Sequence, residues 1–521
     1  MRKRSRKTLI RHNVMIAFLF VGPFAPFLIY LQGGVAILGD CASYNQTIGL
    51  NTSEFIPPNF KTMAYWADIL DKRFEDLHMP SNIALRCTFT DYTYSNISYY
   101  HSTDNVGLST GLALATYCFK YKACKDIGDA DGMAQALRII KGLVDGFSML
   151  LAVPSGGIGP DYPQHPTRFV WSPEDAEIEG FEYITNWINN KKGYYNVRHY
   201  NGSGIYINHR WRGWTSKDEC GGWFFGLGRA LQLVDDPWVQ ERVKLLTAQM
   251  IEGFRKTNWM ITSGEGFPVG TDLKASLLSG EWILSLLSMG KLAYPERYGE
   301  LYHHYLTKEM YGNMAIGNSW TNTIMDYYAQ SFGHKNVFNL ITLTEDPNLR
   351  KYLVNQYVRG MYDNIKYHRV PYFNMMYLVL TGDDNETIRE DIFDQLMRFK
   401  FFNIEANGAI RNLNATPRPS WHQKNPKIEY WREALVSNPL FAIYQPLTIE
   451  FGVLDKNNRP FYLQPLRIEN WLNDIGNFYG SHPFEERRST TGNGLSEGCG
   501  NVFTVVYWMG RAYGIIPPPT S

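Results

Sequence analysis

The segment CGGWFFGLGRALQLV at residues 220–234 is followed at once by DPWVQERVKLLTAQMIEGFRK at residues 236–256. The first segment combines glycines with apolar residues and has no continuous polar face, which predicts a helix buried on all sides. The second segment repeats apolar residues at helical spacing among charged ones, which predicts a helix buried on one face. Asp-Pro between them is a helix start signal. The two segments therefore predict a hairpin of one inner helix and one outer helix.

The same alternation recurs along the rest of the chain. It is seen in the segments 60–77, 107–124, 129–151, 273–292, 294–310, 319–334, 346–365, 370–382, 385–401, 428–446 and 499–516. Six hairpins of this kind predict an inner ring of buried helices inside an outer ring of amphipathic ones. The expected fold is thus all-α, an (α/α)6 toroid, with strands confined to insertions such as a β-hairpin at 193–208.

The N-terminus carries the signature of a membrane anchor. A basic tail at 1–13 precedes an apolar run, VMIAFLFVGPFAPFLIYL at 14–31, and no acid or base follows until Asp40. A cleaved signal peptide is the alternative, but the run is long for one and lacks a clear cleavage site. We therefore expect a cytoplasmic tail at 1–13, a transmembrane signal anchor at 14–35, a stem at 36–59 and the toroid domain at 60–521.

This orientation places the large domain outside the cytoplasm, as a single-pass membrane protein. Six glycosylation sequons are compatible with it, at Asn45, Asn51, Asn96, Asn201, Asn385 and Asn414. The six cysteines permit disulfides in such a compartment, and their spacing does not suggest a metal site. Lys plus Arg is 51 and Asp plus Glu is 50, a balance that argues against a nucleic-acid-binding protein.

Two other all-α architectures are less consistent with the sequence. An α-solenoid would show a repeat of fixed length, whereas here long insertions at 155–215 and 400–428 interrupt the pattern. A terpenoid-cyclase-type barrel would carry Asp-rich metal motifs, and none stands in a pocket-like context here. A lanthionine-cyclase-like zinc site needs two Cys and a His, and only Cys220 and Cys499 are candidates for the cysteines.

The pattern resembles the six-hairpin glycosidase-like superfamily over roughly residues 60–516. The features that carry the resemblance are the inner helices rich in small residues, the loops with Asp, Trp and Gly just before them, and the Gly-Asp turn after the first inner helix. The resemblance implies a carbohydrate site in the mouth of the toroid, on loops that precede the inner helices and carry carboxylates and aromatic residues. It implies no cofactor.

The densest group of polar and aromatic residues is NHRWRGWTSKDECGGWFFGLGRA at 208–230. Two acids, Asp218 and Glu219, begin the buried helix there, and each can also be explained as a residue of the helix N-terminus. The neighbours that favour a sugar site are His209, Arg212, Trp214 and Lys217. Aromatic residues make up 15% of the chain, and they can serve either a large core or sugar stacking.

Other candidate residues come from five further segments. Asp161 lies in a Gly- and Pro-rich loop at 154–171, and Glu497 lies in LSEGCGN, which we expect to start another inner helix. Asp104 is interpreted as a helix cap. Substrate-binding candidates near the starts of other inner helices are Asn322, Asp326, His368 and Tyr372.

The expected function is that of a membrane-anchored glycoside hydrolase, in which two carboxylates drawn from Asp161, Asp218, Glu219 and Glu497 flank the bond to be cleaved. A polysaccharide lyase or sugar epimerase on the same fold is the first alternative, for which His209, Arg212 and Tyr372 are suitable residues. A non-catalytic glycan-binding or scaffold protein is the second. The number of acids that converge in one cleft discriminates between these functions.

The membrane assignment predicts that residues 36–521 are shielded in sealed vesicles. Protease added from the cytoplasmic side should remove only the basic tail and leave a fragment close to full length on a gel. Digestion of the large domain from that side would show the opposite orientation.

Overall fold

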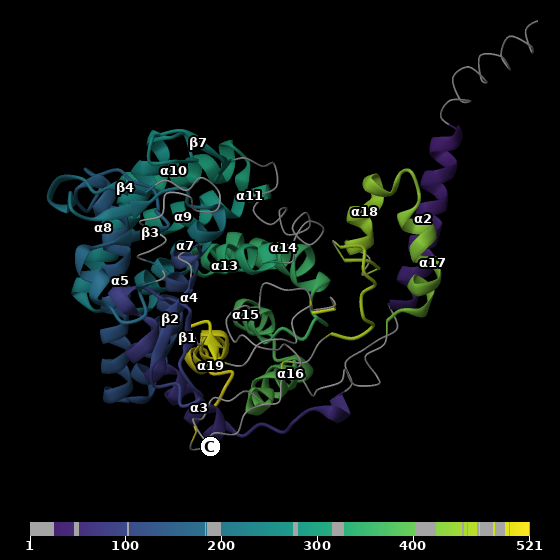
Figure 1. Ribbon diagram of the computed structural model, residues 1–521, viewed down its shortest axis with the longest axis horizontal. Coiled ribbons are helices and arrows are strands. Elements are labelled where there is room, and N and C mark those ends of the chain that lie inside the picture. Colours follow the sequence, from purple (N-terminus) through teal and green to yellow (C-terminus); the bar gives the residue numbers. More distant parts are fainter. Residues whose placement is uncertain are drawn as a thin grey trace, which may run out of the picture.

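The structure is a computed structural model. It describes residues 25–45, 52–101, 104–182, 184, 199–274, 280–314, 328–401, 424–450, 453–455, 457–465, 468, 483–484, 495–499 and 501–519. The described part is mostly helical with a few short strands (Figure 1), which confirms the all-α class.

Six helices with few exposed residues form the interior. They are α4 (Val106–Ile127), α7 (Lys217–Leu233), α9 (Gly280–Ala293), α13 (Tyr328–Leu343), α15 (Pro371–Thr381) and α19 (Asn501–Ala512). Helix α4 packs against α7 and α19, α7 packs against α13, α13 packs against α15, and α15 packs against α19. Helix α9 contacts both α7 and α13. The series of contacts from α4 through α7, α13, α15 and α19 therefore leads back to α4.

Glycines set how closely α4 and α7 approach. A Cβ built on Gly111 would lie 1.9 Å from the carbonyl oxygen of Gly222, and one on Gly226 would lie 2.6 Å from the carbonyl oxygen of Gly111. The backbones are therefore in direct contact, and no other residue fits at these positions without a shift. Gly107 lies against the side chains of Glu219 and Trp223 in the same interface. The order of these pairs shows that α4 and α7 run parallel.

Six further helices cover the interior. They are α3 (Phe60–Arg73), α5 (Ala130–Ser155), α8 (Pro237–Lys256), α10 (Pro295–His303), α14 (Pro347–Gly360) and α16 (Glu386–Met397). Each contacts the inner helix next to it, α5 with α4, α8 with α7 and α9, α10 with α9, α14 with α13 and α16 with α15. Helix α3 contacts α19, so the first and last helices of this body meet.

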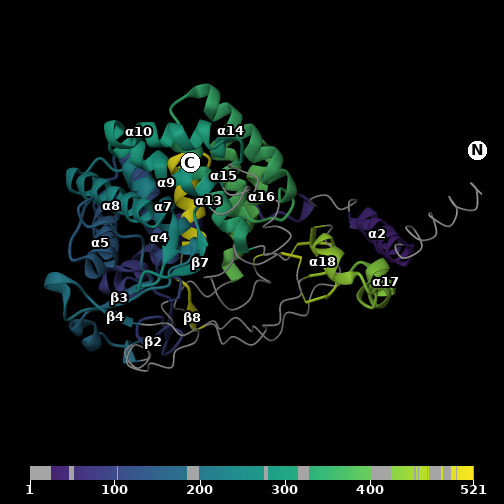
Figure 2. The same cartoon turned by 90° about the horizontal axis from the view of Figure 1, so that it is seen from above.

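Short strands lie along one side of the helical body, where β2, β3, β4 and β8 are seen together in Figure 2. The strands are β1 (Cys87–Phe89), β2 (Ile97–Tyr100), β3 (Phe169–Trp171), β4 (His199–Asn201), β5 (Arg210–Arg212), β6 (Met260–Thr262), β7 (Pro268–Asp272) and β8 (Ser496–Glu497). They pair antiparallel in the orders β2-β1-β8, β3-β5-β4 and β6-β7. Strands β2, β5 and β8 come just before α4, α7 and α19, so they position the loops at the N-terminal ends of inner helices.

The segment expected as one outer helix at 428–446 is instead two helices, α17 (Pro426–Val436) and α18 (Phe441–Glu450). Both pack against α2 (Ala25–Asn45), and Figures 1 and 2 show the three helices beside the main body. The reason is a separate small core, in which Leu38 of α2 packs with Ile428 and Leu435 of α17. The partner of the last inner helix, α19, is therefore α3.

Helix α2 begins within the segment expected to be the anchor, and residues 14–24 of that segment lie outside the described residues. None of the helices in the described ranges is long and apolar enough to cross a membrane. The anchor and the orientation of the protein remain predictions. A short helix, α11 (Tyr311–Met314), completes the set of α-helices in the described part.

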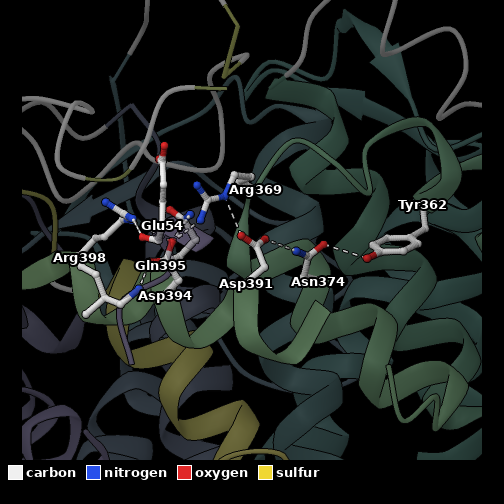
Figure 3. A network of polar contacts seen from close by, with 9 residues as sticks. Glu54, Tyr362, Arg369, Asn374, Asp391, Asp394, Gln395 and Arg398 are labelled. Carbon is white, nitrogen blue, oxygen red and sulfur yellow. Dashed lines mark hydrogen bonds and ion pairs between the residues drawn. The ribbon is translucent and has the colours of Figure 1, made fainter. Parts of the chain in front are cut away.

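A buried network of charges fastens the segment before α3 to α16 (Figure 3). Arg369 binds Asp391 at 2.7 Å and also binds Asp394, and Arg398 donates to Asp394 at 2.8 Å. Arg398 also donates to the backbone carbonyl of Glu54 at 3.1 Å. Two carboxylates are thus offset by two guanidiniums, which is the condition under which buried charges are tolerated. The network holds the chain where it enters the helical body.

The sequence permits disulfides, but five of the cysteines are free thiols in the structure. They are buried, at Cys87, Cys118, Cys124, Cys220 and Cys499.

The close contact of α4 with α7 predicts an unusual sensitivity to one methyl group. Gly111→Ala should lower the free energy of unfolding by about 3 kcal/mol or more, because its Cβ would overlap the backbone of Gly222 and rigid backbone cannot move aside. Gly299→Ala in α10 is the matched control, since a Cβ there meets nothing within 4 Å, and it should stabilise the helix slightly. Urea unfolding of the full chain measures both, and equal stabilities for the two variants would refute the glycine contact.

Candidate functional site

Glu219 is a buried acid at the N-terminal end of the inner helix α7. It lies in the first turn of α7, after the N-cap Ser216, and its side chain is fully buried. One carboxyl oxygen, Oε2, accepts a hydrogen bond from Thr215 Oγ1 at 3.0 Å. The other, Oε1, has no hydrogen-bond partner in the described part of the chain and lies 3.8 Å from Arg168 Nη1. A buried acceptor without a donor is costly, so it marks either strain or a ligand site.

The environment of Glu219 changes its acidity. Burial raises the pKa of Glu219 to about 7, while Arg168, Thr215 and Arg212 oppose that rise. The loss of water is the dominant cause because it disfavours the charged carboxylate. Glu219 therefore exists in both protonation states near neutral pH, which is the property required of a general acid or base.

Arg168 connects Glu219 to a second acid, Asp104. Its guanidinium donates to the backbone carbonyl oxygens of Asp104 and Trp214 as well as facing Glu219. The Asp104 carboxylate in turn binds Arg212 Nη2 at 2.5 Å. The N-cap residue of α4 is Asn105, not Asp104, so the interpretation of Asp104 as the helix cap is corrected. Asp104 is half exposed and can reach a ligand.

Arg212 is held by the sheet β3-β5-β4. In this sheet it lies opposite Phe169 on one side and His199 on the other. Burial lowers the pKa of Arg212, although Asp104 counteracts this effect. Burial and the nearby guanidinium lower the pKa of His199 to about 4, so His199 is uncharged at neutral pH. The insertion before α7 thus serves to place one guanidinium beside Asp104.

Three sequence-predicted residues belong to the same region as Glu219. Trp214 has a left-handed backbone with φ of 62°, and its indole is 38% exposed. Lys217 places its ammonium 5.0 Å from the ring centre of Trp282 in α9. Asp218 is half buried, and its negative charge favours the protonated form of the Lys335 amine in α13. The structure therefore brings Arg212, Trp214, Asp218 and Glu219 to one end of α7, with Lys217 beside them.

Glu497 has a different environment from the one expected. It lies in β8 opposite Cys87, four residues before α19, and does not start the helix. Arg73 Nη1 binds it at 2.7 Å and His78 Nε2 lies at 3.3 Å. Although burial opposes the change, these partners lower the pKa of Glu497 to about 2. A carboxylate that is always ionised and already paired cannot donate a proton near neutral pH.

The remaining predicted residues have no contact with Glu219 or Asp104 in the described part of the chain. Asp161 is exposed in the loop after α5, and its negative charge contributes to the raised pKa of Arg297 in α10. His209 contacts Tyr206 of its own loop, with ring centres 5.5 Å apart. His368 lies 5.1 Å from the Phe484 ring, and Tyr372 is buried in the first turn of α15. Asn322 and Asp326 lie outside the described residues.

The sequence missed the roles of Asp104, Arg168 and Lys335. Arg168 was visible only as one polar member of a loop, because its 51-residue separation from Glu219 hides the contact. Lys335 had a local signal, since a lysine inside an otherwise apolar helix must be paired or functional. In the described ranges, no group of three or more His, Cys, Asp and Glu residues is arranged to hold a metal ion.

A cavity of about 470 Å³ lies at the other end of α4. It is lined by Asp68, Lys120, Asp129, Asp131, Gly132, Ala134, Gln135, Arg138 and Trp508. Lys120 follows Gly107 by 13 residues along the helix, which places the cavity roughly 20 Å from Glu219. The two lining cations are already paired, Lys120 with Asp71 and Arg138 with Glu75. The cavity is therefore separate from the candidate site.

Comparison of the chain with protein-family models, with curated proteins and with solved structures gives no match. The conclusions about function consequently rest on the residues and their geometry.

The raised pKa of Glu219 predicts how stability depends on pH. The unfolded chain releases this proton near pH 4.5 and the folded chain near pH 7, so the free energy of unfolding should fall as pH rises between these values. The loss amounts to about 3 kcal/mol and is complete above pH 7. Glu219→Gln should remove this loss and be more stable than the wild type at pH 8. Parallel urea titrations at pH 4.5 and pH 8 measure the difference, and identical pH profiles would show that Glu219 is an ordinary surface-like acid.

Proposed function

We propose that the protein is a membrane-anchored glycoside hydrolase built on an (α/α)6 toroid, with its site at the N-terminal ends of the inner helices. The cyclic contacts of α4, α7, α13, α15 and α19, with α9 beside them and six helices outside, support the toroid. The resemblance to six-hairpin glycosidases, if it extends to function, implies a substrate site at the end where Glu219 lies. The observation that carries the proposal is the buried Glu219 with a free carboxyl oxygen beside Arg168.

Hydrolysis of a glycosidic bond requires an acid that protonates the leaving oxygen and a second carboxylate on the other side of the bond. Glu219 has the properties of the acid, because burial raises its pKa to about 7 and Oε1 accepts no hydrogen bond from the residues that the structure describes. Asp104 has those of the second carboxylate, because Arg212 stabilises its charge. Arg168 touches both residues and can keep their separation fixed.

Trp214 supplies the surface against which a sugar ring can stack. Its indole is partly exposed beside Arg168, which binds its backbone carbonyl. A flat aromatic face offers apolar area to the C–H side of a pyranose while the sugar hydroxyls stay available for hydrogen bonds. The left-handed backbone of Trp214 is costly and persists because the surrounding contacts hold it.

A polysaccharide lyase or a sugar epimerase is the second candidate. It is supported by the two guanidiniums, Arg168 and Arg212, since such reactions need cations to stabilise a uronate carboxylate while a proton leaves the adjacent carbon. Glu219 is buried and has a pKa of about 7, so it can also serve as the group that accepts that proton. The two candidates differ in product, because a lyase leaves a carbon–carbon double bond and a hydrolase adds water.

The hydrolase proposal predicts that Glu219→Gln lowers turnover by about 10²–10⁴-fold, because the amide keeps the shape of the acid but cannot donate its proton. Asp104→Asn should lower turnover to a similar extent. Hydrolysis of nitrophenyl glycosides and of a polysaccharide panel by the full chain measures both. Asp161→Asn is the matched control, since this exposed acid lies away from Glu219, and it should keep full activity.

Full activity of Glu219→Gln on any glycan that the wild type cleaves would overturn the assignment of the acid. Products that absorb as unsaturated uronates would identify the lyase instead. Binding without turnover by the wild type would identify a glycan-binding protein.

A further inference from the structure

Lys335 is a buried amine that the proposed reaction does not use. It lies in the inner helix α13 and is 2% exposed. It forms no hydrogen bond or ion pair with any residue that the structure describes, and its Nζ lies 5.5 Å from the Phe332 ring centre. An ammonium ion without hydrogen bonds in such a place is costly. A purely structural role would be served better by methionine or leucine.

The packing of α7 with α13 puts Lys335 near the level of the Glu219 site. Gly221 lies against Asn336 and Gly228 lies against Asn339, so the two helices run parallel and share the same N-terminal end. Below this level the rings of Phe225 and Phe338 pack with centroids 5.8 Å apart. Apolar side chains therefore lie next to Lys335 on the side away from the N-terminal ends of the helices.

Burial and the neighbouring charges set the pKa of the Lys335 amine. Burial lowers the pKa of Lys335 to about 7, and Asp218 opposes that change. Titratable groups also come from each helix packed against α13 and from α13 itself, namely Asp218 and Arg229 from α7, Glu281 from α9, Tyr357 from α14, Tyr372 from α15 and His334 from α13. His334 is uncharged at neutral pH because burial lowers its pKa to about 4, and Arg229 binds Asn339 at 2.8 Å. A negative ligand group would add the counter-charge that keeps Lys335 protonated.

Three cations, Arg168, Arg212 and Lys217, lie at the N-terminal end of α7 together with the acids Asp104, Asp218 and Glu219. Glu281 lies in the first turn of the neighbouring helix α9. Protonation of Lys335 adds a fourth cation. Such a site attracts anions and disfavours a second negative group in the protein itself.

We propose that Lys335 is a specificity-determining residue that recognises an anionic substituent, a carboxylate or a sulfate, on the glycan bound at the Glu219 site. The inference rests on the proposed function in one respect, since the ligand is a glycan bound at that site. It concerns binding, so it does not depend on which bond the protein breaks.

Proton uptake is the signature of this role. Above pH 7 the free protein holds Lys335 largely uncharged, and an anionic sugar beside it favours the charged form. Binding above pH 7 therefore takes up a proton, and affinity falls as pH rises from 7 to 9. A neutral sugar has no such effect on Lys335. Glu219 titrates in the same range and can contribute to the uptake, so the part due to Lys335 is the part lost when Lys335 is replaced.

Calorimetric titration of the full chain with three probes tests the proposal. The probes are an unsulfated oligogalacturonate, a sulfated oligosaccharide of neutral sugars, and an uncharged cello-oligosaccharide. Titrations at pH 8 in two buffers of different ionisation enthalpy measure the protons taken up. We expect uptake of up to one proton with one or both anionic probes and none with the uncharged probe, and the two anionic probes distinguish carboxylate from sulfate.

Three variants complete the experiment. Lys335→Met should reduce affinity for the preferred anionic probe at least tenfold and lower the uptake below that of the wild type, without loss of stability. Lys335→Arg, which stays charged, should bind with the same lowered uptake. Lys291→Met is the control, because Lys291 is partly exposed at the other end of α9, where it pairs with Glu345, and it should behave like the wild type.

Equal affinity and equal uptake in Lys335→Met and wild type would overturn the role of Lys335, whereas a Glu219-dependent hydrolase with such a result would still satisfy the proposed function. Proton-linked binding of an anionic glycan without any turnover would support the proposed role of Lys335 and would contradict the proposed hydrolase activity. Binding of none of the three probes at pH 7 or pH 8 would count against Lys335.

Discussion

The contact between α4 and α7 is the constraint on which the rest of the structure depends. Gly111 faces Gly222 and Gly226 so closely that backbone touches backbone. Gly221 and Gly228 also lie in α7. The space beside them is filled by Trp282 of α9 and by Asn336 and Asn339 of α13. One glycine-rich helix thus makes close contacts with three others, and its first turn is held where their N-terminal ends meet. The precision of that contact is what lets an acid in the first turn be fully buried and yet lie near a loop from a distant part of the chain.

That burial produces the chemistry of the site. Glu219 lies near Gly107, where a Cβ would come within 2.3 Å of the Trp223 indole nitrogen, and no donor among the described residues satisfies Oε1. A buried unpaired acceptor destabilises the fold by about 1–3 kcal/mol. The packing of the inner helices offsets this loss. Strands that contribute little to the core have a second use here, because β5 carries Arg212 to Asp104 and the loop before β3 carries Arg168 to Glu219. The helices fix the acid and the insertions fix its partners.

Much of the helical pattern could be predicted from the sequence, because buried and amphipathic helices differ in composition over many residues. The segment 220–234 and its partner at 236–256 became α7 and α8 almost as expected. The segment 428–446 did not, because its apolar residues pack on Leu38 in a small separate core that local periodicity cannot reveal. Among the site residues, Arg212, Trp214, Asp218 and Glu219 were found because they are neighbours in the chain. Asp104 and Arg168 were not assigned to Glu219, since only the fold brings the loop at 104, the start of β3 and the start of α7 together.

Glu219 and Glu497 show why residue type and position in a loop were insufficient to identify the acid. Both are buried glutamates near the N-terminal end of an inner helix, and in both cases the next two residues are a glycine and a cysteine. Glu497 receives a guanidinium at 2.7 Å and an imidazole at 3.3 Å, so its charge is stabilised and its pKa falls to about 2. Glu219 has its nearest guanidinium at 3.8 Å and one hydroxyl, which is too little to offset the loss of water, so its pKa rises to about 7. A difference of about one ångström in the approach of one arginine, together with one histidine, separates an acid that holds strands together from one that can exchange a proton with a substrate.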